Sequence, residues 1–168
     1  IFLDEIGDIS PAMQVRLLRV LQDHAVEPLG ALSPLKVDVR VVAATNKDLH
    51  KEIEEGNFRE DLYHRLAVIL IRVPDLNERR EDIPLLIDHF IRKFNAIKDK
   101  DIERISEEAL DILLRYDFPG NVRELENIIE YAFILCSSDQ IESQCLPDSI
   151  HPHLPKNDTN KILTRVQS

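Results

Sequence analysis

The segment Ile1-Phe2-Leu3-Asp4-Glu5 places two adjacent acids directly after a short apolar run. A buried strand of a parallel sheet is typically such a run, and acids at its carboxyl end face the crevice where open α/β sheets bind ligands. Asp4 is therefore a candidate ligand for Mg²⁺, and Glu5 is a candidate base that polarises a water for attack on a γ-phosphate. The alternative is that both are ordinary exposed acids at a strand end, since short motifs also occur by chance.

The composition is that of a globular chain. Its 168 residues are 43% hydrophobic and 31% charged, which allows one core or two small subdomains. No apolar stretch reaches the ~20 residues that cross a bilayer, and no signal-peptide pattern opens the sequence, so we expect a cytoplasmic protein without a membrane partner. The formal net charge of −10 disfavours nucleic-acid binding by this segment, because phosphate contacts need clustered Lys and Arg. Cys136 and Cys145 lack CxxC spacing and a His cluster, so we expect two reduced thiols.

Strand and helix patterns alternate through residues 1–75, which predicts a parallel α/β sheet. Ser10 is a typical N-cap with Pro11 at the first helical position, so a helix should follow the acidic strand. Residues 37–44 and 67–73 are apolar runs that predict two further buried strands, and the Pro- and Gly-containing residues 27–36 predict a loop or short hairpin. The predicted apolar face of the first helix consists of Met13, Leu17, Leu18 and Leu21.

Every later pattern is helical, which predicts a small bundle over residues 76–150. From residue 83 onward apolar residues recur at intervals of three and four, as on one face of a long helix. Ser106 is the expected N-cap of a second helix, and Asn121, with Glu124 three positions later, is the expected N-cap of a third. Residues 151–168 show no core-facing pattern and are expected to form a linker.

Two arginines stand between the second and third predicted strands. Arg59 and Arg65 lie six positions apart, about 600° around a helix, so both can hardly pair with the same neighbouring acid. At least one could reach another subunit, where a guanidinium opposite a γ-phosphate stabilises transition-state charge. The alternative is two surface arginines in local ion pairs of little energetic consequence.

A third arginine, Arg123, lies in the first turn of the last predicted helix and outside its apolar face. The helix dipole disfavours a cation there, whereas a helix start together with an arginine suits an anion such as a nucleotide phosphate. The alternative is an exposed arginine that Glu124 or Glu126 neutralises.

Four segments, in this order, resemble the motifs of one family: the AAA+ ATPase domain of bacterial enhancer-binding activators of sigma-54 RNA polymerase. The four are residues 2–8 (FLDEIGD), similar to the Walker B strand; 41–49 (VVAATNKDL), to sensor I; 58–66 (FREDLYHRL), to the arginine-finger segment; and 118–125 (FPGNVREL), to the sensor II helix. The resemblance extends over about residues 1–150.

The resemblance implies an α/β fold in two domains. Residues 1–75 would be the C-terminal part of a P-loop AAA+ parallel-sheet subdomain and residues 76–150 an all-helical lid bundle, with 151–168 a linker toward a DNA-binding domain. The loop at residues 27–36 would be the pre-sensor I insertion, which moves with the nucleotide state.

The resemblance also implies a role for each matching residue. Arg59 and Arg65 would act in trans on a neighbouring subunit's nucleotide, and Arg123 would report hydrolysis to the lid. The implied catalytic residues are Asp4, Glu5, Asn46, Arg59 and Arg65. Those implied to bind ATP are Asp4, Thr45, Asn46 and Arg123, and Asp4 is the implied Mg²⁺ ligand, with Glu5 nearby.

The implied function is mechanical: a ring, expected to be a hexamer, spends ATP to remodel the closed complex of sigma-54 RNA polymerase holoenzyme. Enhancer DNA would be bound only through a further C-terminal domain, and a two-component response regulator is one form the parent protein could take. The P-loop and the sigma-54-contacting loop precede the Walker B strand in this family and are absent from the sequence, so we expect the chain alone not to hydrolyse ATP.

Two other functions stay open at this point. One is a non-catalytic, AAA+-derived oligomerisation module, against which the combined presence of Asp4, Glu5, Asn46 and Arg123 argues. The other is a different AAA+ machine, such as a clamp loader or a helicase. The sequence preceding Ile1 would discriminate among the three functions.

Overall fold

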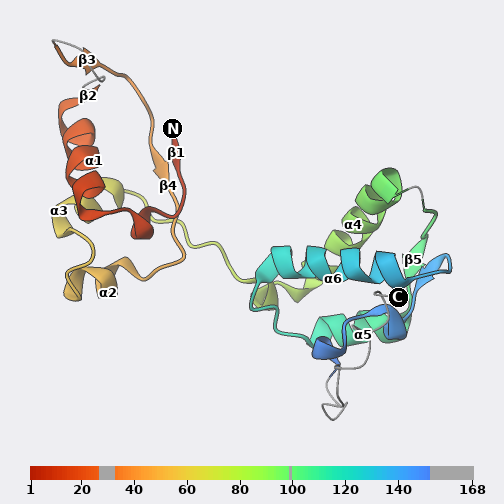
Figure 1. Ribbon diagram of the computed structural model, residues 1–168. Coiled ribbons are helices and arrows are strands. Elements are labelled where there is room, and N and C mark those ends of the chain that lie inside the picture. Colours follow the sequence, from red (N-terminus) through yellow and green to blue (C-terminus); the bar gives the residue numbers. More distant parts are fainter. Residues whose placement is uncertain (27–32, 99, 152–168) are drawn as a thin grey trace, which may run out of the picture. The chain divides into compact units, whose positions relative to one another are not determined.

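The computed structural model describes residues 1–26, 33–98 and 100–151, which form two compact units, Ile1–Arg72 and Val73–Ser168 (Figure 1). The loop expected at residues 27–36 lies partly outside the described residues, and the expected linker at 151–168 lies almost entirely outside them. Within the described residues, no helix is both long enough and apolar enough to span a bilayer.

The first unit is built on one pair of parallel strands. Strand β1 pairs with β4, with Phe2 opposite Val42 and Leu3 opposite Ala43, while β2 and β3 form an antiparallel pair. Its small core consists of Ile6, Leu18, Phe58 and Leu62. The elements are β1 (Phe2–Leu3), η1 (Ile6–Asp8), α1 (Pro11–Asp23), β2 (Ala25–Val26), β3 (Leu35–Lys36), β4 (Val42–Ala43), α2 (Leu49–Glu54) and α3 (Glu60–Leu66).

Helix α1 begins as the sequence predicts and turns Leu17, Leu18 and Leu21 toward the core as predicted, but not Met13. The Ser10 hydroxyl accepts a hydrogen bond from the Met13 amide at 3.3 Å, and Pro11 occupies the first helical position. Met13 is 50% exposed, so its predicted place in the core is wrong. Gln14 is buried there instead, because its amide group finds hydrogen-bond partners inside the unit.

The two later strand predictions are largely wrong. Only Val42 and Ala43 of residues 37–44 are in a strand, and Val42 is 52% exposed. Residues 67–73 form no strand, and their large apolar side chains reach the surface with exposed fractions from 73% to 83%. A strand needs a hydrogen-bonded neighbour, and no strand among the described residues pairs with residues 67–73. The exposed apolar side chains are Val68, Ile69, Leu70, Ile71 and Val73.

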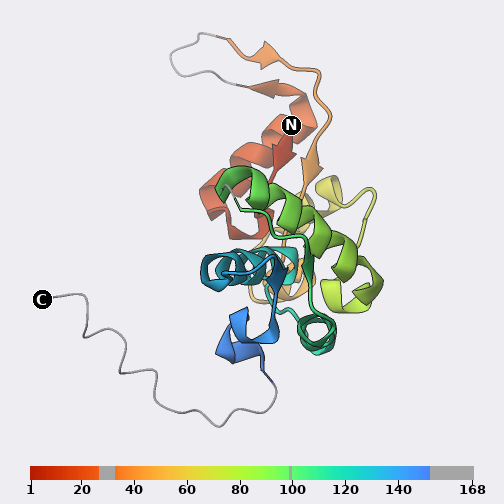
Figure 2. The same ribbon diagram turned by 90° about the vertical axis from the view of Figure 1, so that its right-hand side faces the viewer.

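The second unit is a helical bundle, as predicted, but it is not all-helical, because it also contains one pair of short strands (Figure 2). Helix α4 (Ile83–Lys98) packs against α6 (Asn121–Leu135) and, over fewer residues, against α5 (Glu107–Arg115), around an extensive apolar core. Short parallel strands, β5 (Arg104–Ile105) and β6 (Gln140–Ile141), close one side. The Ser106 hydroxyl accepts from the Ala109 amide at 3.2 Å, which confirms the predicted cap of α5. The remaining elements are η2 (Leu76–Glu78), η3 (Arg80–Asp82), η4 (Ser143–Cys145) and η5 (Asp148–Ile150).

The predicted cap of α6 is wrong. Gly120 is the N-cap residue, and Asn121 has a left-handed backbone with φ of 53°. The Asn121 side chain instead accepts from the Leu76 amide at 2.7 Å and donates to Asp75 at 3.1 Å. The Asn121 side chain therefore does not cap α6. It links the start of α6 to Asp75 and Leu76 at the start of the unit. Glu124 does act at the helix start, since its carboxylate accepts from the Gly120 amide at 2.7 Å.

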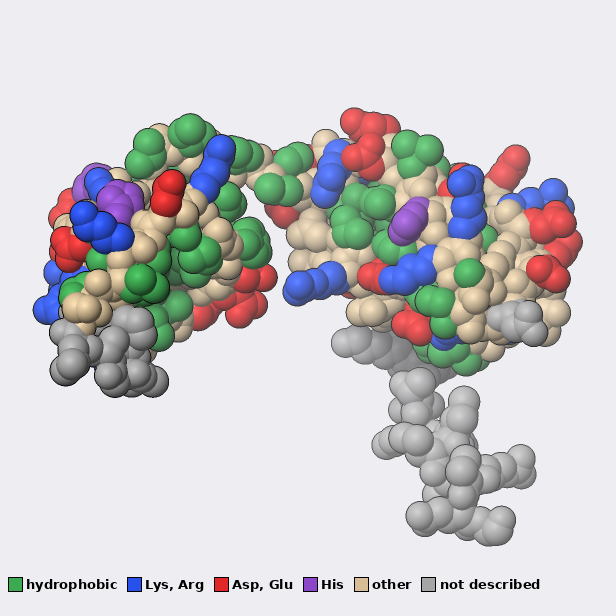
Figure 3. Space-filling view, turned by 90° about the horizontal axis from the view of Figure 1, so that it is seen from above, with side chains coloured by type: hydrophobic (Ala, Val, Ile, Leu, Met, Phe, Trp, Pro, Cys, Tyr) green, Lys and Arg blue, Asp and Glu red, His purple; other side chains and the backbone are tan. Residues whose placement is uncertain are grey.

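Apolar side chains reach the surface of both units (Figure 3), and those of residues 67–73 are strongly exposed. The double substitution Ile69→Lys with Ile71→Lys should reduce self-association of the chain without lowering its unfolding midpoint, because these side chains are 76% and 83% exposed. Light scattering and thermal unfolding measure the two quantities.

The matched control is Ile129→Ala, at a fully buried position of α6. It should cost about 2 to 5 kcal/mol of stability, because it opens a cavity in the core. A double variant that unfolds as early as this control would show that residues 67–73 are packed in the folded chain.

Candidate functional site

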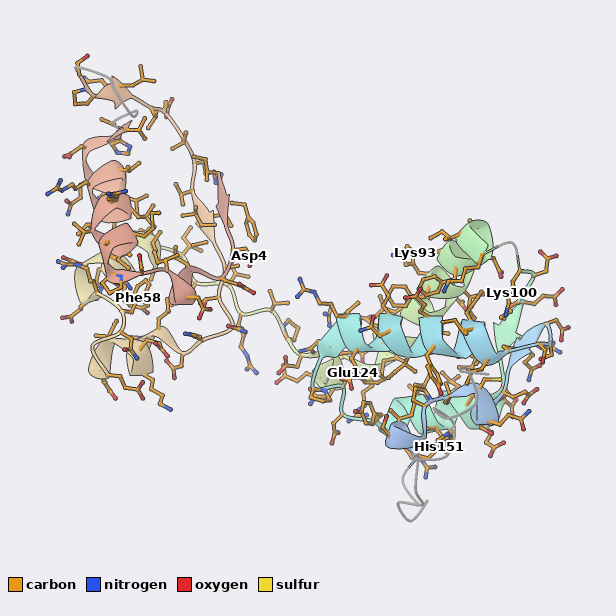
Figure 4. The ribbon with its side chains drawn as sticks, in the orientation of Figure 1. Asp4, Phe58, Lys93, Lys100, Glu124 and His151 are labelled. Carbon is orange, nitrogen blue, oxygen red and sulfur yellow. The ribbon has the colours of Figure 1, made fainter. Side chains whose placement is uncertain are left out.

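Asp4 and Glu5, here called the acid pair, directly follow β1 (Figure 4). Both side chains are exposed, and the Asp4 carboxylate accepts a hydrogen bond from the Glu5 amide at 3.0 Å. Glu5 has φ 52° and ψ 43°, in the left-handed region that costs a residue with a Cβ about 1 to 2 kcal/mol. Strained conformations of this kind concentrate at functional sites, where they direct a side chain. The backbone therefore turns sharply at the residue that is the candidate base.

The carboxyl end of β4 lies beside the acid pair. The Ala44 amide donates to the Leu3 carbonyl at 2.8 Å, and the Ile6 amide donates to the Ala44 carbonyl at 2.9 Å. Thr45 and Asn46 follow β4 after Ala44, so four of the predicted site residues share one edge of the sheet. Asn46 is exposed, and its amide makes no hydrogen bond to the described part of the chain.

The turn after the acid pair packs tightly on the segment that follows β4. A Cβ at Gly7 would stand 2.8 Å from the Thr45 hydroxyl and 3.2 Å from side-chain carbons of Lys47. The Lys47 ammonium lies 2.7 Å from the Asp8 carboxylate, and this hydrogen bond is the main cause that raises the pKa of Lys47. The Thr45 hydroxyl accepts from the Lys47 amide at 3.1 Å. Sequence reasoning missed Asp8 and Lys47, although opposite charges after two paired strands are a usable signal.

The acid pair could supply a ligand to a divalent cation of the Mg²⁺ type. Mg²⁺ is commonly bound through one or two carboxylates, with waters and substrate phosphates completing its coordination. Asp4 fits this donor set, because it is exposed and only one of its two carboxylate oxygens accepts a hydrogen bond within the described chain. Among the described residues there is no group of three or more His, Cys, Asp or Glu side chains that would bind a metal ion by themselves.

The two arginines of the middle segment are both exposed and have different acceptors. Arg59, the N-cap residue of α3, forms a two-bond pair with Asp61, with Nε to Oδ1 at 2.9 Å and Nη2 to Oδ2 at 2.6 Å. Arg65 donates from Nε and Nη2 to the Leu21 carbonyl at 3.1 and 2.9 Å. The expectation that one acid could not serve both arginines is thus met. Exposed contacts of this kind contribute little free energy, so either guanidinium can exchange its partner.

Asp61, which the sequence offered with Glu60 as a local acid for these arginines, is the partner of Arg59. Its Oδ1 also accepts from the Leu62 amide at 2.8 Å in the first turn of α3. The pKa of Asp61 is lowered, chiefly by the hydrogen bond from Arg59, and the same bond raises the pKa of Arg59. Asp61 therefore holds Arg59 against its own chain.

Arg123 belongs to the second unit, in the first turn of α6, and its side chain is exposed. The two acids proposed as its neutralising partners are engaged elsewhere: Glu124 accepts from the Tyr116 hydroxyl at 2.8 Å, and Glu126 pairs with Lys93. Within the described residues Arg123 has neither a hydrogen bond nor an ion pair from its side chain. An exposed guanidinium at a helix start remains available to an anion.

Comparison with known proteins gives two family matches. Residues 1–72 match the model of the sigma-54 interaction domain, and residues 77–162 match that of the AAA+ ATPase lid domain. The transcriptional regulatory protein ZraR of Salmonella typhimurium is 51% identical over 150 residues, 89% of this chain and 34% of its own length. The nitrogen fixation protein AnfA of Azotobacter vinelandii is 51% identical over 150 residues, 89% of this chain and 28% of its own. The chain thus spans about a third of the length of these curated relatives.

A solved structure shares the fold. The crystal structure of NtrX from Brucella abortus in complex with ATP superposes with a TM-score of 0.82 at 38% identity, over 89% of this chain and 36% of NtrX. The α/β class expected from the sequence, with its helical lid, is therefore confirmed.

The Arg59–Asp61 pair predicts a titration that can be measured directly. Replacing Arg59 by Gln should raise the pKa of Asp61 toward the ordinary value of about 3.9, because the guanidinium that stabilises the carboxylate is gone. Side-chain carboxyl NMR during an acid titration gives this pKa. Arg65→Gln is the matched control and should leave the pKa of Asp61 unchanged, because Arg65 donates to a carbonyl.

The sign of the effect on stability follows from the lowered pKa. The stabilisation from this pair is present above the unfolded-state pKa of Asp61 and is lost as pH falls through the lower folded-state value. Identical Asp61 titrations in the two arginine variants would contradict the pairing.

Proposed function

This chain belongs to the sigma-54 interaction domain family of AAA+ ATPases, and on that basis we propose that it is part of an ATP-hydrolysing ring that remodels the sigma-54 RNA polymerase closed complex. The observation that carries the proposal is the meeting of the acid pair with Thr45 and Asn46 at the carboxyl edge of β1 and β4. Open α/β sheets bind their ligands at this edge. The likeness to an ATP-bound NtrX supports a nucleotide as the ligand.

The acid pair would carry the hydrolytic chemistry. Asp4 would hold Mg²⁺ through its exposed carboxylate, and Glu5 would take a proton from the attacking water. Mg²⁺ held there would supply positive charge that offsets the negative charge developing on the phosphate. The left-handed backbone at Glu5 fits this role, because it fixes the direction of the base before substrate arrives.

Thr45 and Asn46 would complete the phosphate side of the site. The Asn46 amide is exposed and unengaged within the described chain, so it can donate to a phosphate oxygen or orient the water. The Thr45 hydroxyl stabilises the backbone at residues 45–47 by accepting a hydrogen bond from the Lys47 amide. The Lys47–Asp8 ion pair would then hold the segment after β4 against the η1 turn while nucleotide is bound.

The three arginines would contact nucleotide phosphates from outside the edge formed by β1 and β4. Arg59 and Arg65 are exposed, and we place them opposite a neighbouring subunit's γ-phosphate in a ring, expected to be a hexamer. Arg123 would bind a phosphate oxygen from the lid. The partner is sigma-54 RNA polymerase holoenzyme in the bacterial cytoplasm, and enhancer DNA would be bound by another domain of the parent protein. The sequence has no P-loop, so this chain alone should not turn over ATP.

The test compares ATP turnover by this chain with turnover by a longer form that also carries the P-loop, at rising protein concentration. Turnover should occur only in the longer form and should rise more than in proportion to concentration, because each site needs two subunits. A longer form that is folded and assembled but inactive would overturn the proposal and favour a non-catalytic oligomerisation module.

Glu5→Gln in the longer form should bind ATP with little change yet lose turnover by about 10² to 10⁴-fold, because the water loses its base while Asp4 still holds the metal. Equilibrium nucleotide binding and steady-state turnover separate the two effects. Glu54→Gln, at an exposed acid on α2, is the control and should remain active. Normal turnover in Glu5→Gln would refute the role of Glu5.

Arg65→Ala should abolish turnover on its own but regain part of it when mixed with Glu5→Gln subunits. The mixed ring contains sites in which an intact acid pair meets an intact arginine from the neighbour. Turnover is followed across a series of mixing ratios, with wild-type dilution as the reference. If no ratio restores activity, Arg65 does not act in trans.

A further inference from the structure

The most deeply buried polar side chain of the first unit is that of Gln14, which is 1% exposed. Its Nε2 donates to the Ile9 carbonyl at 3.2 Å and to the Asn57 carbonyl at 2.9 Å, while its Oε1 accepts from the Arg59 amide at 2.9 Å. Two carbonyls on one side and an N–H group on the other leave a single orientation for the amide. The three bonds satisfy both donor hydrogens and the acceptor oxygen of Gln14.

These partners belong to the two halves of the candidate site. Ile9 directly follows the η1 turn that leads away from the acid pair, and Asn57 and Arg59 open the segment that carries the arginines. Gln14 lies on α1 between them, so one side chain contacts the backbone of both. Phe58, which is 3% exposed, anchors the same short segment in the core (Figure 4).

Helix α1 holds the arginine segment at a second place as well. Arg65 donates to the Leu21 carbonyl, near the carboxyl end of α1. Gln14 thus holds the start of α3 through the Arg59 backbone, whereas the exposed Arg65 side chain adds only a weak, exchangeable contact to Leu21 at its end. The position of α3 therefore depends on α1, and the position of α1 depends on the turn after the acid pair.

We propose that Gln14 is a positioning residue: its buried amide holds the backbone of Arg59 at a fixed distance from the acidic turn and so aims the arginine segment at the neighbouring subunit. The inference rests on the proposed function. Without the Gln14 amide, the Ile9 and Asn57 carbonyls and the Arg59 amide all lose a partner in a partly buried place, and the segment is then free to move away from α1. A shift of about 1 Å in a positioning group can cost 10²-fold in rate.

The experiment uses Gln14→Leu in the longer, P-loop-containing form. Turnover should fall by about a hundredfold, and mixing with Glu5→Gln subunits should restore part of it. The Gln14→Leu subunit keeps its own acid pair, and the Glu5→Gln subunit supplies correctly placed arginines. Gln22→Leu, the same change at an exposed position of α1, is the matched control and should stay within twofold of wild type.

The outcomes separate this inference from the proposed function. A wild-type form without turnover refutes the proposed function itself. An active wild type with an equally active Gln14→Leu overturns only the role of Gln14. A Gln14→Leu variant that is inactive and gains nothing from Glu5→Gln at any ratio acts through its own acid pair or its fold, which also overturns the inference.

Gln14→Glu keeps the test decisive if the leucine variant does not fold. Ionised, the new carboxylate has no hydrogen to give the Ile9 and Asn57 carbonyls; protonated, it has one donor and one acceptor. Its turnover relative to wild type should therefore rise as pH is lowered from about 8 to about 6, because burial raises the pKa of the new carboxyl. In mixtures with Glu5→Gln the activity should be present at both pH values. A pH-independent ratio would overturn the proposal.

Discussion

The parallel pairing of β1 with β4 is the constraint on which the first unit depends. Parallel strands end on the same edge of a sheet, so pairing Leu3 with Ala43 brings the residues after both strands together whatever their separation in sequence. The hydrogen bond from the Ile6 amide to the Ala44 carbonyl extends the contact past the strands themselves. The acid pair, Thr45 and Asn46 share one place because the backbone ladder determines it, and the exposed side chains of Asp4, Glu5 and Asn46 stay available for a ligand.

The turn after the acid pair transmits that constraint to the rest of the unit. Gly7 allows the turn to approach Thr45 closely, and the Lys47–Asp8 pair links the two segments from the side. The chain then enters α1, whose Gln14 reaches back to the turn and forward to the arginine segment. A displacement of the acid pair is therefore passed to α1 and α3, because the partly buried hydrogen bonds of Gln14 join them and breaking these bonds costs free energy.

Local signals in the sequence predicted local structure well. Ser10 and Ser106 cap their helices as expected, because an N-cap depends only on the next few residues. The failures all depend on distant partners. Residues 67–73 have strand composition but no pairing strand in the described chain. The Asn121 side chain accepts from the Leu76 amide, 45 positions away, and Gln14 is buried because Asn57 and Arg59 supply its hydrogen-bond partners. The candidate site was predictable as a set of motifs, whereas the supports that join its halves were visible only in three dimensions.

In the proposed function the arginines act on a neighbouring subunit, and weak local contacts suit such a shared site. A guanidinium free in solution would pay conformational entropy to enter a neighbour's site, whereas Arg59 and Arg65 are already ordered by Asp61 and by the Leu21 carbonyl. Because these contacts are exposed, breaking them costs little free energy. A charge-assisted hydrogen bond between the guanidinium and a desolvated phosphate is stronger. A buried pair of the same geometry would hold the arginines too strongly for such an exchange, since removing one partner leaves an uncompensated buried charge. The partly buried hydrogen bonds from Gln14 to the backbone of the segment, together with weak exposed contacts to its side chains, allow the arginines to change partner without moving the helix that carries them.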